Sequence, residues 1–293
     1  MSVAYRSPVD WAKDATMQLT AGGSAGLVEI LVMHPLDLVK TRFQVQQTGQ
    51  ARSYSSLADC FRQIYRQEGF PSFYKGILPP ILAEIPKRAT KFCTFEQYKR
   101  LFTCDQLTLP MTFSLAGLGC GFTEAIVVQP FEVVKVQLQA DRDVVLQKIA
   151  QRDGWGTKGL YRGVTATLMR HGVWNMAYFG LYHSIKLRYP GPENSAGQSL
   201  LYRFALGFTS GTIASIINIP FDVAKSRIQG PQPEPGKVKY YGCTRTILLV
   251  YREEGFLALY KGLLPKCMRL GPGGAILMIV YEAVYGFLKE NMG

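Results

Sequence analysis

Long apolar stretches of the chain alternate with short polar ones, and this alternation occurs three times. Each unit begins and ends with an apolar segment that predicts a helix. The first helices are expected over about 14–43, 110–139 and 199–228, and the second over about 78–103, 166–187 and 264–289. Between them lie polar loops with short amphipathic segments, "YSSLADCFRQIYRQEG", "VVLQKIAQRDG" and "YGCTRTILLVYREEG". Stretches 106–123 and 204–221 carry no charge over 18 residues, which is just enough to span a bilayer.

A charged motif ends the first helix of every unit, with an acid two, a lysine five and a glutamine nine residues after a proline. The copies are Pro35/Asp37/Lys40/Gln44, Pro130/Glu132/Lys135/Gln139 and Pro220/Asp222/Lys225/Gln229. Glycine pairs of the GxxxG kind precede each copy in register and permit close helix packing in lipid. The pattern predicts one all-α transmembrane domain over 1–293, built from three tandem repeats of two spans each with pseudo-threefold symmetry. The repeats are expected at about 14–103, 110–187 and 199–289.

The composition indicates that the helices line a polar cavity. Apolar residues make up 47% of the chain, yet the mean hydropathy is only +0.04. That value is low for a membrane protein, unless only the outer faces of the helices are apolar. The net charge of +12 favours anionic partners. No nucleic-acid motif, metal-ligand spacing or nucleophile motif is present, so we expect neither nucleic-acid binding nor enzyme activity, and no cofactor.

The charged motif indicates a gate. An acid and a lysine three residues apart lie on nearly the same helical face, so they can pair within one helix. Local pairs do not explain why the motif recurs where a proline kinks each helix. If the three helices converge, each acid can instead meet the lysine of the next helix and close one mouth of a cavity. The predicted pairs are Asp37–Lys135, Glu132–Lys225 and Asp222–Lys40, with Gln44, Gln139 and Gln229 placed to hydrogen-bond them.

A second set of charges lies on the second helix of each unit. Twenty residues after Gly76, Gly163 and Gly262 come Glu96, His183 and Glu282, and three residues further come Lys99, Lys186 and Tyr285. The same wiring predicts the pairs Glu96–Lys186 and Glu282–Lys99, whereas His183 and Tyr285 form no strong ionic pair. This second gate is therefore expected to be the weaker one. Two gates at opposite ends of one cavity predict alternating access rather than a pore.

These motifs resemble those of the mitochondrial carrier family over essentially the whole chain. The resemblance also rests on the aromatic-base-glycine motifs Tyr74-Lys75-Gly76, Tyr161-Arg162-Gly163 and Tyr260-Lys261-Gly262. Within the family, stretches such as "FYKGILPPILAEIPKRATKF" and "YKGLLPKCMRLGPGGA" are similar to those of members that exchange 2-oxodicarboxylates. The resemblance implies a multi-pass protein of the mitochondrial inner membrane that exchanges 2-oxoadipate, 2-oxoglutarate and related dicarboxylates. It also implies that the first gate and the amphipathic helices face the matrix and the second gate faces the cytoplasmic side.

The resemblance further implies where a substrate binds. Family binding positions match Lys87, Arg88, Lys91, Arg170, His171 and Arg269. Arg170 and Arg269 are mid-helix, and guanidinium groups bind carboxylates in a bidentate way. His171 can donate to a keto oxygen, or it is a packed neutral residue, and the cations can alternatively extend to lipid headgroups. Glu29 and Glu124, six residues before their prolines, either structure the cavity or carry a proton.

Repeat 2 departs from the other two repeats on the matrix side. From the motif glutamine to the next acid-glycine pair there are 25 and 26 residues in repeats 1 and 3, but only 15 between Gln139 and Gly154. Gln137 also stands where the other repeats have Arg42 and Arg227. The shorter loop puts the geometry of that side in question, although no gate or binding residue is lost.

Three functions remain open from the sequence. The first is a monomeric antiporter of 2-oxodicarboxylates with five to seven carbons, with small dicarboxylates as substrates and membrane lipid, including cardiolipin at the matrix side, as a partner. The second is a carrier of the same family for four-carbon dicarboxylates or amino acids. The third is a membrane scaffold without transport, although a scaffold has no need of intact gates.

Overall fold

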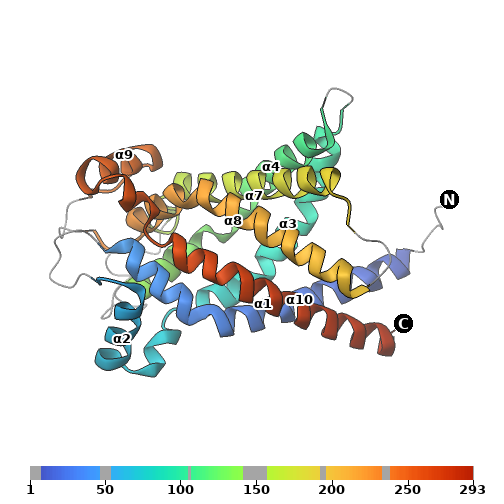
Figure 1. Ribbon diagram of the computed structural model, residues 1–293, viewed down its shortest axis with the longest axis horizontal. Helices are drawn as coiled ribbons and strands as arrows, with labels where there is room; N and C mark the ends of the chain where they lie inside the picture. The colour runs from blue at the N-terminus through green and yellow to red at the C-terminus, as the bar shows by residue number, and fades with distance from the viewer. Residues whose placement is uncertain are drawn as a thin grey trace.

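The computed structural model describes residues 8–46, 54–104, 107–140, 157–191, 196–232 and 238–292, and this part of the chain contains helices and no strand. Six long helices run side by side (Figure 1). They are α1 (Pro8–Val45), α3 (Leu78–Phe102), α4 (Leu109–Ala140), α7 (Val164–Arg188), α8 (Ala196–Gln229) and α10 (Leu263–Met292). All six predicted spans are therefore helical, and α1, α4 and α8 carry a proline within the helix, as expected.

The six long helices form a closed ring. Each contacts the next one along the chain, and α10 returns to contact α1. The short helices α2 (Leu57–Glu68) and α9 (Cys243–Glu254) lie at one end of the ring, and the described ends of α1 and α10 lie at the other (Figure 1). The remaining short elements are η1 (Phe70–Tyr74), α6 (Thr157–Leu160) and η2 (Phe256–Tyr260). The amphipathic segment expected at 144–154 lies outside the described residues.

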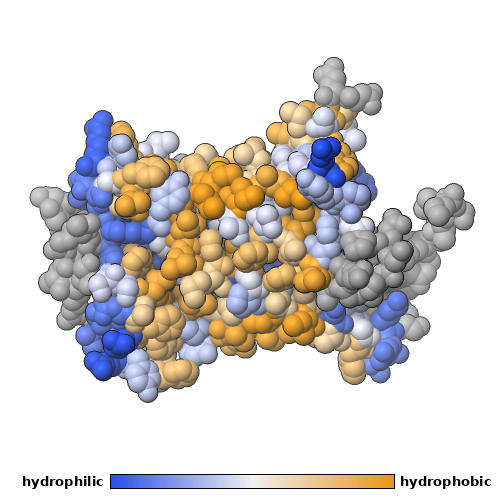
Figure 2. Space-filling model, viewed as in Figure 1, coloured by the Kyte–Doolittle hydropathy of each residue, from blue (hydrophilic) through white to orange (hydrophobic). Residues whose placement is uncertain are grey.

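The surface and the interior have opposite polarity. On the face shown in Figure 2, an apolar band crosses the middle of the molecule between two polar ends. Large apolar side chains such as Leu31, Ile217 and Phe287 are exposed on the outside, whereas Gln129 and Asp222 are buried. This distribution suits lipid outside the ring and a polar space inside it, because bilayer hydrocarbon tolerates only apolar side chains.

In the described part of the chain, hydropathy identifies only some of the six predicted membrane spans. Within the described ranges, four segments are long and apolar enough to cross a membrane, namely Thr16–Val45, Leu109–Gln139, Leu201–Gln229 and Phe256–Asn291. Helices α3 and α7, at 25 residues each, are not among them. A helix of that length measures about 37 Å, which exceeds the hydrocarbon thickness. Because α3 carries Lys87, Arg88 and Lys91, its low hydropathy reflects charge in the segment rather than insufficient length.

The aromatic-base-glycine motifs pack one repeat against another. Their glycines have φ angles of +74°, +71° and +86°, a region that favours glycine. A Cβ at Gly76 would lie 3.2 Å from Cγ of Gln139, and one at Gly262 would lie 2.7 Å from Cγ of Gln44. The third glycine approaches Gln229 in the same way. Each motif glycine thus leaves room for the glutamine that ends the first helix of a neighbouring repeat.

The GxxxG pairs do not all have the role predicted from sequence. In repeat 2, a Cβ at Gly117 or Gly121 would lie within 3 Å of the α7 backbone, so α4 and α7 approach closely. In repeat 1, a Cβ at Gly26 would instead meet the side chains of Glu84 and Arg88. That glycine makes space for a charged pair rather than for a helix backbone.

Candidate functional site

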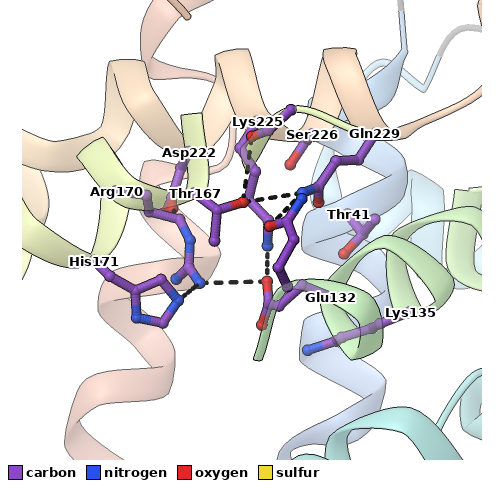
Figure 3. Close-up of polar contacts among 12 residues, drawn as sticks. Thr41, Glu132, Lys135, Thr167, Arg170, His171, Asp222, Lys225, Ser226 and Gln229 are labelled. Atoms are coloured by element: carbon purple, nitrogen blue, oxygen red, sulfur yellow. Dashed lines mark hydrogen bonds and ion pairs between the residues drawn. The ribbon is translucent and has the colours of Figure 1, made fainter. Parts of the chain in front are cut away.

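Three ion pairs join α1, α4 and α8 toward the end of the molecule that carries α2 and α9. Each pair links an acid of one repeat to a lysine of another, in the cyclic order in which the sequence pairs them. The pairs are Lys135–Asp37 at 3.0 Å, Lys40–Asp222 at 3.1 Å and Lys225–Glu132. Figure 3 shows the third of these pairs. We call these six residues the charged ring. Their role as a gate stays a prediction.

Cations from the second helices reach the same three acids. The contacts are Arg269 Nε to Asp37 Oδ1 at 3.4 Å, Lys266 Nζ to Asp222 Oδ2 at 2.8 Å, Arg170 Nη2 to Glu132 Oε2 at 3.3 Å and Arg170 Nε to Asp222 Oδ1 at 3.9 Å. Figure 3 shows the Arg170 guanidinium directed from α7 toward Glu132. Each acid is therefore shared between a lysine of the charged ring and a cation of a second helix. Positive charge exceeds negative charge here, which favours an anionic ligand.

The motif glutamines bind hydroxyl groups rather than the ion pairs. Thr41 Oγ1 donates to Gln139 Oε1 at 2.8 Å, and Ser226 Oγ donates to Gln44 Oε1 at 3.0 Å. Gln229 Nε2 instead donates to Thr167 Oγ1 at 3.0 Å. The sequence-based expectation that these glutamines hydrogen-bond the pairs therefore differs from the structure. They still link neighbouring repeats directly beside the charged ring.

Arg42 and Arg227 reinforce two of the three junctions between repeats. Arg42 Nε donates to the Gln139 carbonyl at 3.1 Å, and its other nitrogens bind Glu68 at 2.5 and 2.8 Å. Arg227 Nε donates to the Gln44 carbonyl at 2.9 Å, and Nη2 binds Glu254 at 2.9 Å. Burial by itself would raise the pKa of Glu254, but a hydrogen bond from Lys261 and the charge of Arg227 hold this pKa below its ordinary value.

The predicted cytoplasmic-side pairs are not formed in this conformation. Among the described residues, no ion pair joins Glu96 to Lys186 or Glu282 to Lys99. Lys99 instead pairs with Glu96 of its own helix at 2.6 Å. His183 stacks on Phe113 with ring centroids 3.5 Å apart. The charged ring is therefore closed while the pairs at the opposite end are open, and the interhelical pairs there stay predictions.

The three predicted cations of α3 have different surroundings. Arg88 Nε donates to Glu84 Oε1 at 2.5 Å, and Lys87 Nζ lies 3.8 Å from the other oxygen of the same carboxylate. Lys87 has 44% of its side chain exposed, against 29% for Arg88. Lys91 Nζ donates to Asn175 Oδ1 on α7 at 3.0 Å. Arg88 and Lys91 thus contact polar groups inside the ring, whereas Lys87 is the most exposed of the three.

His171 has protein partners on both ring nitrogens. Nδ1 lies 3.3 Å from Glu124 Oε1, and Nε2 contacts Nη2 of Arg170. Since a guanidinium can only donate, Nε2 of His171 accepts a hydrogen bond. The ring proton is therefore on Nδ1, which donates toward Glu124. A substrate keto oxygen would have to replace one of these partners. Asn175 Nδ2 also donates to Glu124 at 3.4 Å, which makes Glu124 part of a polar network rather than a free acid.

The candidate cations are attached at two levels along their helices. Arg170 and Arg269 each follow the motif glycine of their repeat by seven residues, whereas Arg88 follows its glycine by twelve. Five residues of helix correspond to about 7.5 Å along the axis. The pair Arg170 and Arg269 is thus close to the charged ring, and Arg88 with Lys91 is nearer the opposite end.

Sequence reasoning missed Lys266, Glu84 and Asn175. Lys266 had a detectable signal, because its counterparts four residues after the motif glycines are Pro80 and Thr167, neither of which is charged. An ionisable residue that breaks an internal repeat within a span is rarely placed there without a partner. Glu84 had the same kind of signal, and its pairing with Arg88 lies within one helix. Asn175 had no such signal, because its partners Lys91 and Glu124 lie on other helices and depend on how each helix is rotated about its axis.

Known proteins match the chain over its whole length. The family description "Mitochondrial carrier protein" matches residues 12–106, 109–192 and 197–292. The human "Mitochondrial 2-oxodicarboxylate carrier" is 58% identical, with 99% of this chain and 100% of that protein covered. The "Mitochondrial 2-oxodicarboxylate carrier 2" of Saccharomyces cerevisiae is 38% identical, covering 93% and 94%. The "Mitochondrial citrate transporter D" of Aspergillus niger is 42% identical, covering 94% and 95%. The chain belongs to the mitochondrial carrier family.

Proposed function

We propose that this protein is an antiporter that exchanges 2-oxodicarboxylates, such as 2-oxoadipate and 2-oxoglutarate, across the mitochondrial inner membrane. The names of the human and yeast relatives support this substrate class, and the 58% identity to the human protein extends over the whole chain. The apolar band across the face shown in Figure 2 supports a membrane location. The protein is a carrier and not an enzyme.

The choice of substrate class rests on cationic side chains that are attached at two levels along the helices. Arg170 and Arg269 bind one carboxylate beside the charged ring, and Arg88 with Lys91 binds the other. An extended carbon chain gains about 1.2 Å per bond, so the carboxyl carbons of a dicarboxylate with five to seven carbons lie about 5–7 Å apart. A four-carbon dicarboxylate spans only about 3.6 Å on the same basis. The points at which the two groups of cations are attached differ by about 7.5 Å along the helix axis. The longer dicarboxylates therefore reach from one group to the other with less side-chain movement.

The charged ring acts as the matrix gate in this proposal, and Glu96, Lys99, Lys186 and Glu282 act as the cytoplasmic-side gate. The three ion pairs across the repeats support the first assignment, because separating α1, α4 and α8 must break all of them. Substrate carboxylates bind cations that the gate acids also contact. Substrate binding therefore weakens the matrix gate and favours opening on that side.

Transport by the purified protein in liposomes tests the proposal. Liposomes preloaded with dicarboxylates or oxodicarboxylates of four to seven carbons, with citrate or with amino acids are given external labelled 2-oxoglutarate. The expected result is fast uptake against internal 2-oxoadipate and 2-oxoglutarate, and slower uptake against four-carbon acids. Faster exchange against citrate would favour the activity named for the Aspergillus niger relative, and the absence of any exchange would favour a scaffold.

A further inference from the structure

Three glutamates inside the ring of helices each hold a side chain that is predicted to bind substrate. Glu84 of α3 binds Arg88 at 2.5 Å, and Glu124 of α4 lies 3.3 Å from His171. Glu29 of α1 binds Nη2 of Arg269 at 2.9 Å. In the absence of a dicarboxylate, carboxylates of the protein therefore occupy the groups that a dicarboxylate needs.

Only one of the three glutamates is positioned to be displaced. The side chains of Glu84 and Glu124 are 6% and 3% exposed, and each has more than one polar partner. Glu29 is 20% exposed, and Arg269 is the single ion-pair partner that the described residues give it. Arg269 itself is 35% exposed, so a ligand inside the ring can reach both members of this pair.

The pair with Glu29 leaves one nitrogen of the Arg269 guanidinium without a hydrogen bond among the described residues. Arg269 Nε is buried and has no hydrogen-bond partner among the described residues, although it lies 3.4 Å from Asp37. A substrate carboxylate could accept two parallel hydrogen bonds from the guanidinium, which is the stronger arrangement. The pair also crosses from α1 to α10, and a Cβ at Gly273 of α10 would lie 3.3 Å from Glu29 Oε1. The glycine leaves space beside the carboxylate.

We propose that Glu29 is a competing carboxylate, which binds Arg269 when the carrier is empty and which the substrate carboxylate displaces. This inference rests on the proposed function and adds a residue that sets substrate affinity without binding substrate itself. Glu29 has no equivalent in repeat 3, where Ala214 stands at its position, and its repeat 2 counterpart Glu124 is held in a buried network. The competition therefore belongs to the junction of α1 and α10 alone.

The competition predicts a counter-intuitive effect on transport. Removing an intramembrane charge normally impairs a carrier, yet loss of Glu29 leaves Arg269 free for substrate. We expect Glu29→Gln to lower the KM for external 2-oxoglutarate by about two- to fivefold, as for loss of one partly exposed ion pair. The maximal exchange rate should stay equal or fall, because tighter binding slows release of the product.

Glu29→Asp is the matched control that separates competition from a general effect of charge. It keeps the negative charge but withdraws the carboxylate by about 1.5 Å, which breaks the contact with Arg269. If competition holds, both variants lower the KM. A lower KM in Glu29→Gln alone would assign the effect to the net charge of the cavity and overturn the inference. An unchanged or higher KM in both variants, with thermal unfolding like that of the wild type, would overturn it as well.

The wild-type protein is measured first, so failure of the proposed function is recognised separately. If the wild type exchanges another anion and not 2-oxodicarboxylates, the proposed substrate class is wrong. The two Glu29 variants are then compared with that anion as the probe. Their KM values still decide whether Glu29 competes for Arg269.

Discussion

Arg170 is the residue that the predicted substrate site and the predicted matrix gate have in common. Its guanidinium contacts Glu132 and lies 3.9 Å from Asp222, while its neighbour His171 closes one side (Figure 3). Nε of Arg170 is buried and has no hydrogen-bond partner among the described residues, so its contact with Asp222 is a long ion pair and not a hydrogen bond. A substrate carboxylate that binds the guanidinium withdraws positive charge from two acids of the charged ring at once.

Arg170→Ala is expected to reduce kcat/KM for 2-oxoglutarate by about 10- to 100-fold, the effect of losing a hydrogen bond to a charged group. Arg170→Lys retains the charge but loses the planar fork, so its activity should be intermediate. Initial rates in liposomes give the comparison, and thermal unfolding checks that each variant is folded. Wild-type rates for Arg170→Ala would remove this residue from the site.

Exchanging the charges of Asp37 and Lys135 tests which acid pairs with which lysine in the charged ring. Asp37→Lys alone places like charges together and should inactivate the carrier, whereas adding Lys135→Asp re-forms an ion pair and should restore part of the activity. Rescue should be incomplete, because Arg269 lies 3.4 Å from Asp37 and would face the new lysine side chain. The measurement is exchange by inserted protein. A double variant no more active than Asp37→Lys would count against this pair.

The junction between α4 and α8 has fewer links than the two junctions that involve α1. Thr41 and Ser226 supply hydroxyl groups at the α1 junctions, but their counterpart on α4 is Val136. Gln137 of α4 likewise stands where α1 has Arg42 and α8 has Arg227. Gln229 Oε1 is consequently buried without a hydrogen-bond partner in the described part of the chain. Apart from the Lys225–Glu132 pair and a hydrogen bond from Gln229 Nε2 to Gln129 Oε1 at 3.4 Å, this junction depends on contacts with α7.

Val136→Thr should strengthen the α4–α8 junction, since threonine has nearly the shape of valine and adds a donor near Gln229. One hydrogen bond contributes about 0.5–1.5 kcal/mol, which shifts the balance between the two conformations roughly two- to tenfold toward the closed matrix gate. Thermal stability should rise and the maximal exchange rate should fall. Val136→Ala, which removes methyl groups without adding a donor, should lower stability. If the threonine variant is destabilised as much as the alanine variant, no such bond forms.

The sequence predicts the helices and the charged ring well because both follow from the threefold repeat. A motif repeated at fixed spacing can be paired by symmetry, and this is how Asp37 was assigned to Lys135. The partners of the motif glutamines could not be predicted in this way, because they depend on Thr41 and Ser226 and on helix rotation. Glu84 was also missed, since its pairing with Arg88 is local and breaks the repeat.

The molecule as a whole has one of the two conformations that the sequence predicts. The charged ring is formed toward the end that carries α2 and α9, while Glu96 and Lys99 pair within α3 at the other end. The interhelical pairs of the cytoplasmic-side gate depend on a conformation in which α3, α7 and α10 converge. This explains why a prediction from repeated motifs alone fitted one end of the molecule and not the other.

Exchange of one dianion for another should be nearly independent of membrane potential. The gates move no net charge if each transit carries the same substrate charge in both directions. A net charge would instead couple to the potential by about 2.3 kcal/mol per 100 mV. Initial rates in liposomes with imposed potassium diffusion potentials test this, and the same liposomes without a gradient are the control. A strong voltage dependence would reveal unequal charges or a proton carried with the substrate.

The cross-repeat wiring of the charged ring has an evolutionary consequence. Its pairs join residues as far as 98 and 182 positions apart, so no single repeat can close the ring by itself. A mutation of one acid can therefore be compensated only by a change in a different repeat. We expect descendants of a triplicated ancestral gene to vary freely at exposed apolar positions such as Ile217, but to substitute the charged positions in coordinated pairs between repeats.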